Sequence, residues 1–180
     1  MSALARGLNA LGLLAIVGVL LVLFWYQLAR GQLPCSLCHL QRTGFIAAGI
    51  GLLLNVRFGS SESHYGIAIL GALAGAAAAG RQILLHAAPA SPGGPVLFGM
   101  HLDTWVFVAF CLILVFCGAM LFVESQFVEG VHDVRPDSLA QVLAWLFLLV
   151  ALGNAVSTLL VCGVGSCPEN PTAYQLPWRR

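Results

Sequence analysis

Two pairs of closely spaced cysteines are the residues of this 180-residue chain with the clearest capacity for chemistry. Two residues separate Cys35 from Cys38, a spacing that permits a redox-active disulfide. Four residues separate Cys162 from Cys167, and two of them are glycines that allow the tight turn a bridge would need. Because disulfide exchange requires a thiol that attacks and a second thiol that resolves the product, we take all four as candidate catalytic residues.

Arg42 lies four residues after Cys38, one turn along and on the same face of a helix. If that helix begins near Cys38, its N-terminal dipole and the permanent charge of Arg42 both favour the Cys38 thiolate. The competing interpretation is an arginine whose charged end extends to the lipid headgroups. The nearness of the cysteine favours a functional role.

The elements that must position these residues are membrane-spanning helices. Hydrophobic residues make up 59% of the chain and charged residues 8%, whereas soluble domains carry about 25% charged residues. A net charge of +1 without a basic stretch excludes nucleic-acid-binding proteins. We expect an all-α membrane bundle in one domain, residues 1–180, because five segments can each cross about 30 Å of hydrocarbon. These segments cover residues 8–29, 39–56, 65–86, 102–123 and 138–161.

Small residues recur every four positions in the third segment, at Gly71, Gly75 and Ala79, which predicts a close approach of two helix backbones. Five alternating spans also place both cysteine pairs on the same side of the membrane. The arginines do not decide which side that is, because three lie near each surface.

Three other interpretations of the cysteines stay open at this point. Cys35-Ser36-Leu37-Cys38-His39 matches the C-x-x-C-H signature for covalent haem, with His39 as one axial ligand and either His86 or His101 as the other. The four boundary cysteines could together bind zinc. The chain could also be a non-catalytic membrane subunit with structural disulfides. Cys111 and Cys117, inside the fourth span, are expected to be free thiols.

Residues 34–42, PCSLCHLQR, resemble the disulfide bond formation protein B (DsbB) family, which carries a P-C-x-L-C-x-x-Q/E-R stretch at the start of its second helix. The resemblance implies a four-helix bundle, here with a fifth helix added. It implies a thiol oxidase that re-oxidises a periplasmic thioredoxin-fold (DsbA-like) dithiol partner. The electrons would pass to ubiquinone or menaquinone, with no metal. Cys35 and Cys38 would then be the redox pair, with Cys38 and Arg42 facing the quinone.

The resemblance also implies a location in the bacterial inner membrane. The N-terminus would be cytoplasmic, whereas the CxxC motif and a tail of residues 162–180 would be periplasmic, an oxidising compartment in which disulfides persist. At the end of the third span, His86 shares a helix face with Gln82, and we expect His86 to be a further quinone-binding candidate.

The chain departs from the family pattern in its second cysteine pair. The family has this pair between its third and fourth helices, but here residues 87–101 contain no cysteine. We therefore expect Cys162–Cys167, at the end of the added fifth helix, to exchange with the partner and relay electrons to Cys35–Cys38. A structural clasp for the tail is the alternative. The resting disulfide pattern, with three possible pairings, and the oligomeric state stay open.

Overall fold

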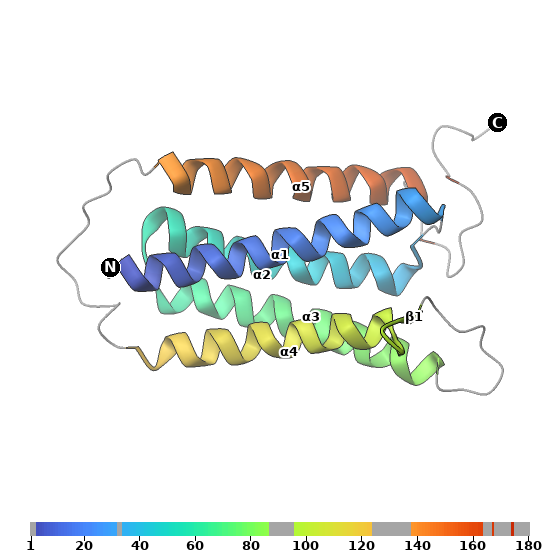
Figure 1. The fold of residues 1–180 in the computed structure, drawn as a ribbon, viewed down its shortest axis with the longest axis horizontal. Coiled ribbons are helices and arrows are strands. Elements are labelled where there is room, and N and C mark those ends of the chain that lie inside the picture. The colour runs from blue at the N-terminus through green and yellow to red at the C-terminus, as the bar shows by residue number, and fades with distance from the viewer. Residues whose placement is uncertain are drawn as a thin grey trace.

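The computed structural model describes residues 3–31, 34–86, 96–123, 138–163, 167 and 174. The other residues predicted for the periplasmic tail and most of the connections at 87–101 and 124–137 lie outside the described residues. Five long helices run lengthwise beside one another (Figure 1). They are α1 (Ala3–Arg30), α2 (Ser36–Phe58), α3 (Glu62–His86), α4 (Leu102–Leu121) and α5 (Ser138–Cys162).

All five helices are long and apolar enough to cross a membrane, so the predicted all-α membrane bundle is confirmed. Three helices begin clearly earlier than the sequence predicted, and one of them is α3, which begins at Glu62 instead of residue 65. Helix α1 begins at Ala3, because a helix can continue beyond its apolar stretch. Helix α2 begins at Ser36, three residues earlier than expected, because the Cys35 sulfur caps its first turn by accepting a hydrogen bond from the Cys38 amide.

A short hairpin that the sequence did not indicate precedes α4. Strand β1 (Val96–Leu97) pairs antiparallel with β2 (Met100–His101), with Val96 opposite His101. The two turn residues Phe98 and Gly99 both have positive φ, which is the backbone conformation that a two-residue hairpin turn of this type requires. Trp105 of α4 holds the hairpin by donating from Nε1 to the Leu97 carbonyl at 3.0 Å.

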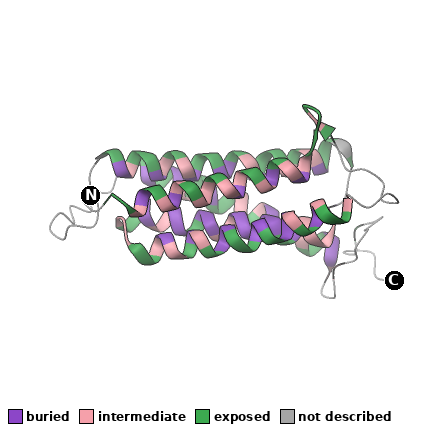
Figure 2. Ribbon diagram, turned by 90° about the horizontal axis from the view of Figure 1, so that it is seen from below, coloured by how far each residue is buried: buried purple, intermediate pink, exposed green. Residues whose placement is uncertain are grey.

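The closest packing in the bundle joins α2 to α3. A Cβ added to Gly44 would lie 2.7 Å from the Gly75 Cα, and one added to Gly71 would lie 2.6 Å from the Ala48 nitrogen. The close approach predicted from the small residues of α3 is therefore confirmed. Buried residues concentrate on the helix faces that meet one another, whereas the outer faces carry exposed apolar side chains suited to lipid (Figure 2).

Replacing Gly44 with alanine should destabilise the bundle by about 1–3 kcal/mol, because the new methyl group meets backbone that cannot move aside. Gly66→Ala is the matched control, because nothing lies within 4 Å of its added Cβ and alanine is the better helix former. Thermal unfolding in detergent measures both. Equal unfolding temperatures for the two variants would show that α2 and α3 are further apart than described.

A buried polar cluster fixes the end of the bundle away from the cysteines. The Asn9 amide donates to the Tyr65 hydroxyl at 2.7 Å, and the Asn55 amide donates to Asn9 Oδ1 at 3.2 Å. All three side chains are fully buried. Since an unsatisfied polar group is costly away from water, this network ties α1, α2 and α3 into one arrangement.

Candidate functional site

Both cysteine pairs lie at one end of the bundle, where α2 begins and α5 ends (Figure 1). Disulfides join Cys35 to Cys38, with 5.1 Å between Cα atoms, and Cys162 to Cys167, with 4.4 Å. Of the three pairings that the sequence allowed, this is the one that the structure adopts. Cys38 lies in the first turn of α2, so its sulfur is close to the positive end of the helix dipole.

Gln82 of α3 provides a polar contact for the Cys35–Cys38 disulfide. Its Nε2 lies 3.6 Å from the Cys38 sulfur, within reach for an N–H donor to sulfur. Gln41 donates to Gln82 Oε1 at 2.9 Å, which holds the amide in place, and Oε1 itself lies 3.9 Å from the Cys38 sulfur. Reduction would place a thiolate beside the Nε2 donor, and a hydrogen bond to a charged group is among the stronger kinds.

Arg42 is buried at the same level, only 5% exposed, so it is not an arginine extended to the headgroups. Its guanidinium donates to Gln27 Oε1 at 2.8 Å and to the Leu23 carbonyl at 3.0 Å, both on α1. Gln27 in turn donates to the Ser157 hydroxyl of α5 at 2.8 Å. These partners are neutral oxygens, so the charge of Arg42 is hydrogen-bonded but not neutralised by them. Such a cation favours negative charge nearby.

An apolar cavity of about 450 Å³ lies between α1 and α5 and shares the Gln27–Ser157 pair as its polar wall. Apart from these two residues, the lining is mostly apolar or aromatic: Phe24, Leu28, Leu149, Leu152, Gly153, Val156, Leu160 and Tyr174. Apolar walls with few polar groups are typical of sites for lipophilic small molecules.

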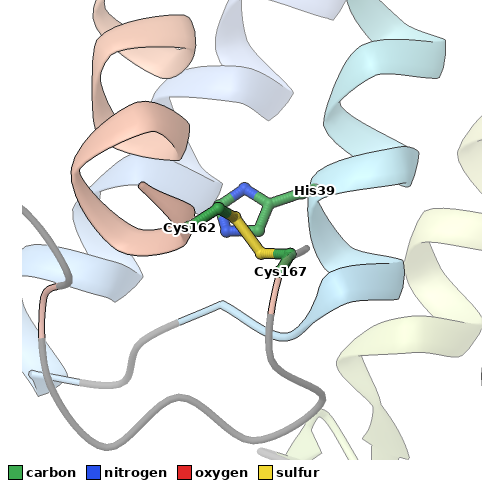
Figure 3. Close-up of side chains that lie close together, drawn as sticks. All are labelled: His39, Cys162 and Cys167. Carbon is green, nitrogen blue, oxygen red and sulfur yellow. A yellow bond between two sulfur atoms is a disulfide. The ribbon is translucent and has the colours of Figure 1, made fainter. Parts of the chain in front are cut away.

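His39 lies beside the second disulfide. It follows Cys38 directly in α2, and its ring faces Cys162–Cys167 (Figure 3). One ligand atom from His39 and the sulfurs of Cys162 and Cys167 all lie within 4.8 Å of one another. These three side chains could bind a metal only if the disulfide were reduced, because a disulfide sulfur is not a thiolate ligand.

His86 pairs with an acidic residue of the next helix. Its Nδ1 lies 2.8 Å from an oxygen of Asp103, so the pair joins the end of α3 to the start of α4. The His86 ring is 6.3 Å from that of His101. The quinone-binding role of His86 stays a prediction.

The alternative interpretations of the cysteines gain no support from this geometry. Haem attachment requires Cys35 and Cys38 to be free, but they are joined to each other, and His39 turns toward α5. A four-cysteine zinc site requires four thiolates, but all four cysteines are in disulfides. Cys111 and Cys117 are free cysteines, as predicted.

Comparison with protein families favours the disulfide-forming interpretation. The profile of the family described as "Disulfide bond formation protein DsbB" matches residues 5–94, which is half of the chain. The chain belongs to the DsbB family. The match includes Cys35, Cys38 and Arg42, and it ends before α4. Helix α5 and the Cys162–Cys167 disulfide therefore lie outside the part that identifies the family.

Curated relatives agree with this assignment. Disulfide bond formation protein B of Marinobacter nauticus is 40% identical over 90 residues, covering 48% of this chain and 54% of that protein. Its namesake from Nitrosomonas eutropha is 36% identical over 102 residues, covering 51% and 63%. Disulfide bond formation protein B 2 of Pseudomonas syringae is 39% identical over 90 residues, covering 47% and 51%. The matched part of the chain thus spans about half to three fifths of the length of these DsbB relatives. No solved structure matches the chain.

Sequence reasoning missed most of the polar side chains around the disulfides. Gln27, Ser157 and Thr158 received no role, and Gln82 was noted only as a neighbour of His86 on α3. The available signal was their position, because polar residues within apolar spans usually face the bundle interior or a functional site. Assigning partners to them required the relative placement of α1, α2 and α5, which sequence periodicity does not supply.

Replacing Gln82 with methionine should slow alkylation of reduced Cys38 by about tenfold at neutral pH, because the thiolate loses a hydrogen-bond donor. Methionine has a side-chain volume similar to that of glutamine, so the packing is kept. Rates of iodoacetamide labelling, followed by mass spectrometry of the Cys38 peptide, measure this. Leu84→Met is the control, because Leu84 lies on the same helix and is 75% exposed. An unaltered rate in the Gln82 variant would mean that the amide does not stabilise the thiolate.

Proposed function

We propose that this DsbB-family membrane protein is a protein-dithiol:quinone oxidoreductase. It re-oxidises a periplasmic thioredoxin-fold dithiol partner and passes the electrons to ubiquinone or menaquinone. The observation that carries the proposal is the environment of the Cys35–Cys38 disulfide. Its Cys38 sulfur lies at a helix N-terminus and beside the Gln82 amide, with a buried arginine one turn away. This arrangement suits a thiolate that donates electrons.

The quinone-binding role rests on Arg42 and the adjacent cavity. A quinone supplies an acceptor for two electrons and two protons. Arg42 is bonded to neutral oxygens of α1, so it can also favour the negative charge that develops on a carbonyl oxygen or on Cys38. The cavity between α1 and α5 offers an apolar wall for a lipid-soluble molecule. Gln27 links the two, because it bonds Arg42 and also lines the cavity.

The partner-facing role is assigned to Cys162–Cys167. The Cys167 residue is half-buried, so an external thiol can approach it, whereas Cys162 is buried beside His39. Exchange would start at this disulfide and continue to Cys35–Cys38, the pair that reduces the quinone. The cysteines would face the periplasm of the bacterial inner membrane, with the N-terminus in the cytoplasm.

Anaerobic turnover tests the proposal. The purified protein is mixed with a reduced periplasmic thioredoxin-fold protein and a short-chain ubiquinone or menaquinone, and quinone absorbance is recorded together with the thiols of the partner. We expect one quinone reduced for each dithiol oxidised. Oxidation of the partner without quinone reduction would contradict the coupling, and oxidation of neither would indicate that the disulfides are structural.

A further inference from the structure

The imidazole of His39 forms a hydrogen bond with Thr158 of α5. The Thr158 hydroxyl donates to the Asn154 carbonyl of its own helix at 2.9 Å, and its oxygen lies 3.0 Å from His39 Nδ1. A hydroxyl has a single proton to donate. With that proton given to the Asn154 carbonyl, we assign His39 Nδ1 as the N–H donor to Thr158. The neutral ring then carries its free lone pair on Nε2.

Among the described residues, the buried Nε2 of His39 has no hydrogen-bond partner. The side chain is only 6% exposed, and Nε2 bonds to no atom of the described residues. The ring edge faces the Cys162–Cys167 disulfide (Figure 3), and the ligand atoms of the three residues lie within 4.8 Å of one another. A buried unpaired nitrogen is costly and needs an explanation, which proton transfer with these sulfurs provides.

Cys162 is poorly placed to leave as a thiolate without help. It is the last residue of α5 and is 8% exposed, so its sulfur lies near the negative end of a helix dipole and has little contact with water. Cys38 is the opposite case, at the positive end of α2. An external thiol that attacks Cys167 would therefore release Cys162 as a thiolate, at a helix end that disfavours negative charge. Such a leaving group needs a proton.

We propose that His39 is the proton carrier for thiol–disulfide exchange at Cys162–Cys167. In the first step Nε2 takes the proton of the attacking thiol, the new sulfur–sulfur bond forms to Cys167, and the Cys162–Cys167 bond breaks. The proton then passes from Nε2 to the Cys162 sulfur. In the second step the other thiol of the dithiol closes its own disulfide, and Cys167 leaves and receives that thiol's proton. Two electrons and two protons are transferred in total.

Few charged residues of the described helices α1, α2 and α5 lie near this histidine. Arg42 lies one turn along α2, α5 contains no charged residue, and α1 contains none between Arg6 and Arg30. The positive charge of Arg42 opposes a long-lived imidazolium, so the proton is held only during the transfer. His39 therefore acts as a carrier between two sulfurs, without a permanent charge.

This inference rests on the proposed relay for its biological role, but its chemistry can be tested alone. A Cys35→Ser/Cys38→Ser background leaves Cys162–Cys167 as the disulfide to be reduced, and dithiothreitol serves as the dithiol. The rate of reduction is measured by quenching with an alkylating agent and counting labelled cysteines. We expect His39→Gln to lower the rate about 10²-fold at pH 7, the lower end of the contribution of general acid–base catalysis.

The pH profile separates proton transfer from packing. With His39 present, the rate should change little with pH above the titration of the imidazole. In His39→Gln it should rise about tenfold per pH unit, in proportion to the dithiothreitol thiolate. His39→Asn is the second variant if the glutamine perturbs folding, and His101→Gln, at an exposed position, is the control.

An unchanged rate in His39→Gln, or a slower rate that keeps the original pH profile, would overturn the inference. Its failure is distinguishable from failure of the proposed function. If dithiothreitol reduction depends on His39 but the intact protein does not oxidise a thioredoxin-fold partner, then the proposed relay is wrong. The role of His39 as proton carrier at Cys162–Cys167 is still supported. If the intact protein oxidises the partner but dithiothreitol reduction does not depend on His39, then the relay is supported and the role of His39 is wrong.

Discussion

Cys38→Ser is expected to lower quinone-dependent dithiol oxidation by about three orders of magnitude, the scale on which loss of an essential nucleophile acts. Serine cannot form a disulfide, and the variant lacks the sulfur that the helix dipole and the Gln82 amide favour as an anion. Anaerobic quinone reduction with a reduced thioredoxin-fold partner measures the loss.

The control for Cys38→Ser is Cys111→Ser, since Cys111 is a free cysteine within α4 and has no proposed role. That variant should keep the rate of the unmodified protein. The unfolding temperature of Cys38→Ser should also be recorded, because a disulfide is lost. A well-folded Cys38→Ser protein with substantial turnover would contradict the assignment of Cys35–Cys38 as the quinone-coupled pair.

Replacing both Cys162 and Cys167 with serine is expected to reduce oxidation of a thioredoxin-fold partner by about two orders of magnitude or more, because the disulfide that receives the partner's electrons is absent. Quinone-dependent re-oxidation of reduced Cys35 and Cys38 should be unaffected in the same variant. Stopped-flow mixing of the pre-reduced variant with quinone measures the second rate independently of the partner.

The double variant also distinguishes the relay from a structural clasp. Removal of a clasp would lower the unfolding temperature, because the disulfide constrains the unfolded chain, but would leave partner oxidation largely intact. Removal of a relay eliminates partner oxidation, whatever the change in stability. Unchanged turnover would therefore show that Cys162–Cys167 is only a structural clasp for the tail.

The sequence was sufficient to predict the helical bundle and the placement of both cysteine pairs at one end of it. Twenty-residue apolar stretches specify the spans, and alternation across the membrane puts α2's first turn and α5's last turn at the same end. The small residues of α3 predicted a close approach to another helix, because only glycine or alanine permits such an approach of backbones, and the structure shows that this helix is α2. These features depend on the residues within a single segment or on the alternation of successive spans across the membrane.

The contacts of the site could not be predicted, because they depend on helix rotation. Arg42 was expected beside the Cys38 thiolate, one turn away on the same face, but its hydrogen bonds run to Gln27 and Leu23 on α1. The contact of Gln82 with the Cys38 sulfur and that of His39 with Thr158 likewise require the lateral order of the helices. Apolar stretches fix the length of a helix but leave its neighbours undetermined.

Anaerobic titration of the fully reduced protein with a quinone tests most directly whether the two disulfides act in series. Each quinone accepts two electrons, and each disulfide supplies two when it forms. With both Cys35–Cys38 and Cys162–Cys167 coupled, the protein should reduce two equivalents of quinone and finish with both disulfides formed, as mass spectrometry of the alkylated chain would show. Consumption of one equivalent, with Cys162 and Cys167 still thiols, would contradict the relay.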